Sequence, residues 1–471
     1  MKIQLIHLGL PPAERRHQFM RAPRLAQLGI KGIVSNRPCL SLLYLASGLQ
    51  IDGHEVEYIE ATSERSETYM KPFISGSPDC VGMTSYAANW RQTLSAIGEM
   101  RAIKPKTVFI AGGFHASSIG ADSLASEPAP DVVFAGEAEE AIREWAKVYD
   151  SPESWDSVPG IYFRREDQVA FTGERKPPAD LDRIPFPAWE LVNLKNYRPA
   201  PNDYFRLPHA SFIGSRGCKH SCVFCPSASQ VRLRSADNML EEIGWLKRYH
   251  SVKDLIFWDE SILISPERTA ALCEKMIEQK IDLTWTANAR VDEVEPGILK
   301  LMRSAGCRQL LFGIESGVRK NIDYLCKGFD IDQVRAAVSK ANNAGILALG
   351  MFMFGIPGET YEEALQTIDF ARSLNLSHAS FVYFTPYPGT ELNKTISESK
   401  KGTLLKDAPF DMKAPSYIPE EMTKDMLVSL QTTAFKRFYL RPGEIVKQIK
   451  ANLNRYKIRD GIQGILTLLF S

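Results

Sequence analysis

The sequence lacks the features that mark membrane-spanning, secreted or nucleic-acid-binding proteins. No run reaches the ~18 apolar residues that a helix needs to cross a bilayer. The amino-terminal apolar run is short and meets two prolines and then charged residues, which predicts a buried strand and not a signal peptide. Neither sign of charge is in excess, because 57 basic residues stand against 56 acidic ones. We therefore expect a cytoplasmic protein with no nucleic-acid partner.

Cysteine is scarce and unevenly placed. Eight cysteines occur in 471 residues, and only Cys218, Cys222 and Cys225 lie close together. Disulfide bonds are not expected in a reducing compartment. The other cysteines stand singly, several of them in apolar or helical surroundings that are typical of small buried side chains. Metal chemistry is therefore expected at one place in the chain.

The first part of the chain alternates short strands with helices. A length of 471 residues predicts two or three domains. Within residues 1–150 the strand-like runs are separated by helical stretches, a rhythm that predicts an α/β domain with a doubly wound, Rossmann-like parallel sheet. Residues 151–205 are rich in proline and charge, contain one hairpin-like pair and are predicted to be a linker.

A second strand and helix series fills residues 206–400. Six strand-like runs occur there, and each is followed by an amphipathic stretch. Repeated units of this length predict a partial (β/α)6 barrel of the TIM type, whose chemistry lies on the loops at the carboxyl ends of the strands. Residues 401–471 are predicted to be mostly helical and carry no further chemical motif.

The three clustered cysteines follow the first strand of the predicted barrel with the spacing C-x3-C-x2-C. Iron–sulfur clusters usually take four cysteines, so three leave one iron without a protein ligand. An open coordination position is what a catalytic metal needs, because substrate binds there. The alternative is a structural zinc site in which His220 supplies a fourth ligand. Zinc modules usually draw their ligands from two separated pairs, and the spacing here favours the cluster.

This segment resembles the signature of the radical S-adenosylmethionine (radical SAM) superfamily. The resemblance implies a [4Fe-4S] cluster held by Cys218, Cys222 and Cys225, with the amino and carboxylate groups of S-adenosylmethionine on the open iron. It also implies a one-electron reductant such as flavodoxin or ferredoxin. Further S-adenosylmethionine contacts are expected at later strand ends, with a ribose-binding carboxylate at Glu315. The full set is Asn288, Arg290, Glu315, Ser316, Gly355, Pro357 and Gly358.

Some of these strand-end residues have a second interpretation. Arg290 suits a clamp for the methionine carboxylate, because guanidinium binds carboxylates through two parallel hydrogen bonds. It could equally be an ion-pair partner of Asp259 or Asp292. Asp259 and Tyr383 are the two candidates for catalytic groups, although a tyrosine on an apolar face is more often part of the core.

The amino-terminal domain resembles the cobalamin-binding domain that precedes the barrel in one large radical SAM subclass. The resemblance rests on Ser85 after one strand and on Gly112 and Gly113 after the next, which would accommodate the nucleotide tail of the corrin. The D-x-H-x-x-G motif that presents a histidine to cobalt is missing from the loop after the first strand. A Rossmann-like domain that has lost its ligand is therefore the alternative.

Together the two resemblances imply a cobalamin-dependent methyltransferase that acts on an unactivated carbon of a small or lipid-like substrate. A 5′-deoxyadenosyl radical would abstract the hydrogen, and methylcobalamin would supply the methyl group. A radical cyclase or rearrangement enzyme is the alternative on the same scaffold, and a non-catalytic iron–sulfur or zinc module is a third. The tail, residues 454–471, places basic residues before an apolar end. It could contact the inner face of a membrane or form a final helix packed on the body.

Overall fold

The computed structural model describes residues 1–9, 36–61, 66–125, 127–199, 203–227, 230–399, 401–405, 414–441 and 443. These residues form two compact units, of which the first ends at Asn196 and the second begins at Tyr197. No helix in the described part of the chain is long and apolar enough to cross a membrane. The tail, 454–471, lies outside it, so the predicted membrane contact has no structural support. The loop after the first strand, where a cobalt-binding histidine motif would stand, lies outside the described residues from residue 10 onward.

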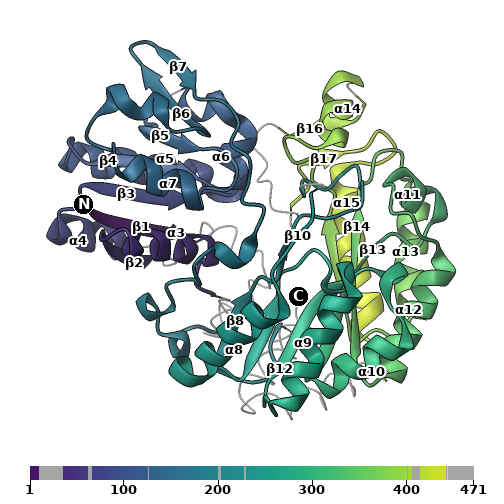
Figure 1. Cartoon of the computed structure of the whole chain (residues 1–471). Coiled ribbons are helices and arrows are strands. Elements are labelled where there is room, and N and C mark those ends of the chain that lie inside the picture. The colour runs from purple at the N-terminus through teal and green to yellow at the C-terminus, as the bar shows by residue number, and fades with distance from the viewer. Residues whose placement is uncertain are drawn as a thin grey trace, which may run out of the picture. The chain divides into compact units, whose positions relative to one another are not determined.

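The first unit contains a seven-stranded sheet with the order β2-β1-β3-β4-β5-β6-β7 (Figure 1). The strands β1 to β5 run parallel, which confirms the predicted doubly wound sheet. The last two strands form an antiparallel hairpin at the edge, so part of the predicted linker extends the sheet. The strands are β1 Lys2–Leu8, β2 Glu55–Ala61, β3 Cys80–Thr84, β4 Val108–Gly112, β5 Val132–Phe134, β6 Ile161–Arg165 and β7 Gln168–Phe171.

Helices cover both faces of this sheet, because alternate residues of the buried strands are apolar on each side. In β1, Ile3 and Leu5 pack in a cluster with residues of α3 and α7, whereas Ile6 and Leu8 pack with residues of α4 and α5. The helices are α3 Leu40–Ile51, α4 Glu67–Gly76, α5 Trp90–Ile103, α6 Phe114–Ile119 and α7 Glu139–Ala146.

The second unit contains a six-stranded sheet with the order β15-β14-β13-β12-β11-β8 (Figure 1). All neighbouring strands pair in parallel, and the chain visits them in sequence order, as predicted for the partial barrel. The strands are β8 His209–Phe212, β11 Asp254–Phe257, β12 Thr284–Ala289, β13 Cys307–Glu315, β14 Leu347–Phe354 and β15 His378–Tyr383.

Helices connect these strands, and four of them begin at side-chain caps. The Ser235 and Ser265 hydroxyls accept hydrogen bonds from backbone N–H groups at the starts of α8 and α9. Asp330 and Thr360 form capping boxes at the starts of α12 and α13. The helices are α8 Ala236–His250, α9 Pro266–Glu278, α10 Pro296–Ser304, α11 Arg319–Tyr324, α12 Ile331–Asn343, α13 Tyr361–Ser373, α14 Glu391–Ser399 and α15 Lys424–Tyr439.

Two short antiparallel pairs complete the second unit. One joins β9 Ser215–Arg216 to β10 Arg232–Leu233 and flanks the loop that carries the three clustered cysteines. The other joins β16 Thr403–Leu404 to β17 Tyr417–Ile418, within the region predicted to be mostly helical. Because all six main strands are parallel, their carboxyl ends share one edge, and the candidate residues that follow them are brought to that edge.

Candidate active site

The three clustered cysteines lie on the loop between β9 and β10. Gly217 has φ +83° and turns the chain just before Cys218. The N–H of Cys225 donates to the carbonyl of Cys222 over 3.0 Å, which closes a turn between these two. All three thiols are half-buried. Among the described residues, no three His, Cys, Asp or Glu side chains converge so as to hold a single ion. A [4Fe-4S] cluster requires no such convergence, because each cysteine binds a different iron.

Burial changes the acidity of the thiols. It raises the pKa of Cys225 to about 11 and also raises the pKa of Cys218 above its ordinary value. Metal ligands must be thiolates, so these groups must lose their protons as iron binds. The donor set fits an iron–sulfur cluster, whose irons compensate the negative charge of buried thiolates.

The cysteine loop is packed against apolar side chains of the second unit. Val223 and Phe224 contact a buried cluster that includes Met353 and Phe384. The carbonyl of Val223 accepts a hydrogen bond of 3.1 Å from the N–H of Leu392 in α14. The segment between the second and third cysteines therefore has a defined position.

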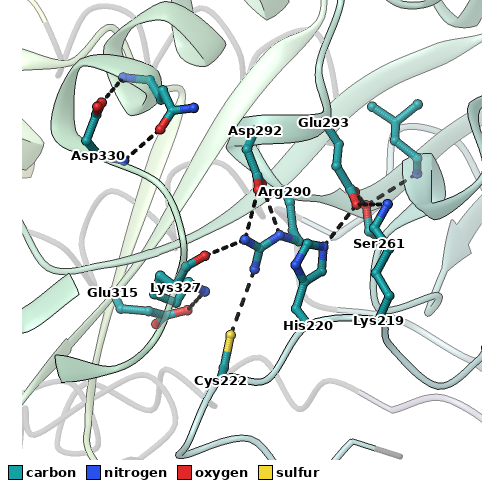
Figure 2. A network of polar contacts seen from close by, with 12 residues as sticks. Lys219, His220, Cys222, Ser261, Arg290, Asp292, Glu293, Glu315, Lys327 and Asp330 are labelled. Carbon is teal, nitrogen blue, oxygen red and sulfur yellow. Dashed lines mark hydrogen bonds and ion pairs between the residues drawn. The ribbon is translucent and has the colours of Figure 1, made fainter. Parts of the chain in front are cut away.

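A buried carboxylate, Glu293, contacts the segment between the first and second cysteines and holds it in place (Figure 2). Its Oε1 lies 3.1 Å from His220 Nε2 and 3.1 Å from Lys219 Nζ, and its Oε2 accepts a hydrogen bond of 2.5 Å from Ser261. Burial acts to raise the pKa of Glu293, but the hydrogen bonds from Ser261, His220 and Lys219 outweigh it, so the pKa lies below its usual value. This use of His220 disfavours the zinc alternative.

Asp259 also acts on the cysteine loop. It is fully buried two residues beyond the end of β11 and accepts hydrogen bonds of 2.7 Å from the N–H of Gly214 and 2.7 Å from the hydroxyl of Ser215. Arg268 lies 3.1 Å from its second oxygen. Both carboxylate oxygens are thus occupied by the start of the cysteine loop and a neighbouring cation. Because both oxygens have partners, this geometry disfavours a catalytic role for Asp259 and favours a positioning role.

Tyr383 points away from the predicted cavity. Its hydroxyl donates a hydrogen bond of 3.1 Å to Gln431 of α15. Phe381, two residues earlier and on the same face of β15, contacts Phe435 and Phe438 of the same helix. Because side chains alternate along a strand, this face packs against α15. These contacts favour the core interpretation of Tyr383 over the catalytic one.

Arg290 lies between a cysteine and an aspartate (Figure 2). Its guanidinium makes two 3.0 Å contacts with the carboxylate of Asp292, and its Nη1 lies 3.8 Å from Cys222 Sγ. Of the two ion-pair partners considered, Asp292 is the one in contact. The nearby Asn288 amide donates a hydrogen bond of 3.0 Å to the carbonyl of Asp259. Arg290 therefore places a charge-compensated cation beside the cysteine loop.

Glu315 has an unusual backbone conformation. Its φ is +68°, a value that non-glycine residues seldom adopt, and the pairing of β13 with β14 shifts register between Gly313 and Glu315. Its Oε1 lies 3.1 Å from Lys327 Nζ (Figure 2). Strained backbone of this kind clusters at functional sites. Ser316 differs, because it is fully buried and its hydroxyl contacts Thr367 at 3.0 Å, which suits support of the turn.

The loop after β14 is held from within by a buried acid. Gly355 and Gly358 have φ +82° and +77°, and Pro357 lies between them. The carboxylate of Glu359 accepts a hydrogen bond of 2.7 Å from the N–H of Gly355, and the amide of Asn321 lies 3.2 Å from its other oxygen. Burial raises the pKa of Glu359 to about 8.

In the first unit the candidate residues lie at the ends of β3 and β4. The hydroxyl of Ser85 donates a hydrogen bond of 3.1 Å to the carbonyl of Gly112. Gly113 has φ +98°, and a Cβ there would lie 2.8 Å from the carbonyl oxygen of Ser85. The close approach of the two strand ends therefore requires this glycine. The next residue, Phe114, is 41% exposed. An apolar face beside backbone polar groups fits a large flat ligand such as a corrin.

Three residues of the site were not anticipated. Glu293 stands in a short acidic segment and Lys327 in a connection between helices, and nothing local distinguishes them from surface charges. Glu359 stands within the Gly355 to Thr360 segment, whose glycines drew attention as turn residues. The only available signal for Lys327 was the glycine that follows it, which can end a helix and turn the chain inward.

Comparison with protein families identifies two domains. Residues 34–146 match the B12 binding domain, and residues 212–371 match the radical SAM superfamily. The first match covers most of the parallel strands of the first unit. The second match begins in β8 and ends in α13, so it contains the cysteine loop, Glu315 and the loop after β14.

Known proteins resemble the chain over most of its length. An uncharacterized methyltransferase of Pyrococcus horikoshii is 27% identical over 477 residues that cover all of both chains. The anaerobic magnesium-protoporphyrin IX monomethyl ester cyclase of Rubrivivax gelatinosus is 26% identical, over 87% of this chain and 75% of its own. The structure of the radical S-adenosylmethionine methyltransferase TsrM from Kitasatospora setae, with cobalamin and a [4Fe-4S] cluster bound, matches with a TM-score of 0.69. That match is 14% identical and covers 94% of this chain and 89% of TsrM, so it supports the fold.

Proposed function

We propose that this chain, a radical SAM protein whose barrel follows a B12-binding domain, is a cobalamin-dependent methyltransferase that acts on an unactivated carbon of a small or lipid-like molecule. We assign cobalamin to the first unit, which ends at Asn196, and the radical chemistry to the second, which begins at Tyr197. The cofactors are a [4Fe-4S] cluster, S-adenosylmethionine and cobalamin. A one-electron reductant is required as a partner.

Bound cofactors supply the difficult chemistry: one electron from the cluster cleaves S-adenosylmethionine to methionine and a 5′-deoxyadenosyl radical, and cobalamin carries the methyl group. The protein binds the cofactors and the substrate and orients them. Cys218, Cys222 and Cys225 would hold three irons of the cluster and would leave the fourth open. Asp259 and Glu293 fix the loop that carries them.

S-adenosylmethionine needs contacts at both of its ends. Glu315 is assigned to the ribose, because a carboxylate accepts hydrogen bonds from two hydroxyls. The backbone of Gly355 to Gly358 is assigned to the adenine, and Asn288 and Arg290 to the neighbourhood of the methionine group. Ser316 supports this site from behind. In the first unit, Ser85, Gly112 and Gly113 are assigned to the corrin tail.

One observation carries the proposal. A continuous set of contacts joins Cys222 to Arg290, Arg290 to the backbone of Lys327, and the Lys327 side chain to Glu315 (Figure 2). A proposed cluster ligand and the proposed ribose ligand thus belong to one network. S-adenosylmethionine has its amino acid and its nucleoside at opposite ends, so a site for it needs two contact regions near each other, and this network joins them.

The test is anaerobic turnover with S-adenosylmethionine that carries a deuterated methyl group. Protein reconstituted with iron, sulfide and cobalamin is incubated with a reductant and with candidate small or lipid-like substrates. The methyltransferase proposal predicts 5′-deoxyadenosine together with a product that contains the label. Unlabelled product with 5′-deoxyadenosine would favour a radical cyclase or rearrangement enzyme, for which the similarity to the Rubrivivax gelatinosus cyclase is the supporting observation. Absence of 5′-deoxyadenosine under every reducing condition would reject both.

A further inference from the structure

Lys327 is a buried lysine at the proposed site. Its side chain is only 7% exposed, and its Nζ lies 3.1 Å from Glu315 Oε1. Lysine is rarely buried unless it is paired, because loss of hydration is costly for an ammonium group. A lysine that served only solubility would stay at the surface. The position of Lys327 therefore requires an explanation.

The backbone conformation on both sides of Lys327 directs its side chain toward the interior. Cys326 and Gly328 have φ +54° and +73°, so left-handed residues flank the lysine. The N–H of Cys326 donates to the carbonyl of Asp323, and that of Lys327 donates to Ile322, which closes the end of α11. A cysteine in the left-handed region is unfavourable, and such strain persists only where the surroundings impose it.

The opposite side of the pair is shaped in the same way. Gly313 lies two residues before Glu315, and a Cβ there would lie 2.7 Å from Glu315 Oε1 and 3.3 Å from Lys327 Nζ. Any larger residue would require the ends of the two charged side chains to shift. The strained backbone at Glu315 turns its carboxylate toward the lysine. Four backbone positions thus accommodate one ion pair, two in β13 and two beside Lys327.

Lys327 also contacts the cysteine loop. Its Nζ lies 5.6 Å from the ring centre of Phe224, which stands between Cys222 and Cys225, and 5.5 Å from that of Phe329. Such cation–π contacts favour the charged ammonium. Arg290 donates a hydrogen bond to the carbonyl of Lys327. The lysine is therefore fixed by the same loop that would carry the cluster.

We infer that Lys327 is a positioning residue that holds the Glu315 carboxylate in place for the ribose of S-adenosylmethionine. The inference rests on the proposed function and adds to it a residue that acts through Glu315. A carboxylate has about four acceptor positions. Lys327 occupies one of them and supplies the balancing charge, which leaves the others for the two ribose hydroxyls.

The experiment measures equilibrium binding to cluster-loaded protein without reductant, so that no turnover occurs. The ligands are S-adenosylmethionine and an analogue that lacks the ribose 2′-hydroxyl. The variants are Lys327→Met, Glu315→Gln and the double variant. The matched control is Lys340→Met, because Lys340 also lies 3.1 Å from a glutamate, Glu295, but on α12 and at the surface. Iron content and melting temperature report on folding.

Lys327→Met should bind S-adenosylmethionine roughly ten- to hundredfold more weakly than the wild type, the range for loss of a charged hydrogen bond. Its loss of affinity for the deoxy analogue should be smaller. In the Glu315→Gln background the same substitution should add little, since the lysine acts through the glutamate. Lys340→Met should bind both ligands normally.

Unchanged binding by Lys327→Met, equal losses for both ligands, or additive losses in the double variant would each overturn the inference. If Lys327→Met does not load iron, Lys327→Arg provides the same comparison. In Lys327→Arg the positive charge is displaced from the position of the lysine ammonium, so the preference for S-adenosylmethionine over the deoxy analogue should fall. An unchanged preference would overturn the inference. A wild-type protein that binds neither iron nor S-adenosylmethionine would instead reject the proposed function.

Discussion

The guanidinium Nη1 of Arg290 lies 3.8 Å from the sulfur of Cys222. The rest of the guanidinium is engaged by Asp292, through two contacts of 3.0 Å. A positive charge beside a cluster thiolate stabilises the reduced, more negative cluster, and the aspartate moderates that effect. Substitutions of Arg290 and of Asp292 should therefore have opposite effects on the reduction potential of the cluster.

Arg290→Gln should lower the reduction potential of the cluster, and Asp292→Asn should raise it, each by on the order of tens of millivolts. A redox titration monitored by electron paramagnetic resonance measures both. Arg319→Gln is the control, because Arg319 forms a comparable pair with Asp323 at the surface. Shifts of the same sign in the two variants would show that Arg290 does not act through its charge.

Anaerobic reconstitution should yield about four irons per chain and a broad brown absorbance, which Cys218→Ala, Cys222→Ala and Cys225→Ala should each abolish. Cys273→Ala is the control, because Cys273 is buried in α9 and outside the loop. Iron analysis and absorbance provide the measurement. Stoichiometric zinc in place of iron would reject the cluster assignment and return His220 to consideration as a ligand.

Glu293→Gln should weaken retention of the cluster by roughly 10- to 100-fold, the range found when groups that support metal ligands are removed. The amide keeps the shape of the carboxylate but loses its attraction to Lys219 and His220. The rate at which a chelator bleaches the absorbance measures this loss. Glu295→Gln, two residues away and paired with the surface Lys340, should bleach at the wild-type rate.

Glu359 should make stability depend on pH. Burial raises its pKa in the folded protein to about 8, whereas an unfolded glutamate has a pKa near ~4.3. Between these values the unfolded chain loses a proton that the folded chain keeps, so this contribution to stability is complete below pH ~4 and is lost as the pH rises to about 8.

Glu359→Gln removes this contribution while retaining an acceptor for the N–H of Gly355. The apparent melting temperature of the variant relative to wild type should therefore rise by several degrees between pH 5 and pH 8. The difference in melting temperature between variant and wild type is used because the titration of all other groups affects both proteins equally. A constant difference over this range would show that Glu359 is ionised in the folded protein.

Phe114→Ala should weaken cobalamin binding by about 5- to 30-fold, because the exposed ring would lose apolar contact with the corrin. Phe171→Ala is a matched control, since Phe171 is 42% exposed at the far edge of the same sheet. Retained cobalamin is measured by its absorbance, with iron content as the internal standard. A substitution at Gly113 is less informative, because a Cβ would collide with Ser85 whether or not cobalamin is bound. Equal binding by the two phenylalanine variants would remove Phe114 from the site.

The alternation of strands and helices and the position of the cysteine loop could be predicted from the sequence because their signals are local. Each buried parallel strand is a short apolar run followed by a turn, and helices intervene at regular distances. The spacing from Cys218 to Cys225 restricts three thiols to one loop. The position of Glu315 after a strand likewise predicted its place at the carboxyl edge of the sheet, where it lies.

The roles of the supporting side chains were decided by the tertiary structure alone. The sequence offered Asp259 and Tyr383 as candidate catalytic groups, and only the tertiary structure shows that they contact Ser215 and Gln431. Glu293 and Lys327 resemble surface charges in the sequence, yet both are buried by segments far along the chain. The sequence thus determined the two sheets, their helices and the loop that carries the thiols. Which charges meet inside the second unit depends on contacts between strand ends distant in sequence, and the cost of burying an unpaired charge makes those contacts specific.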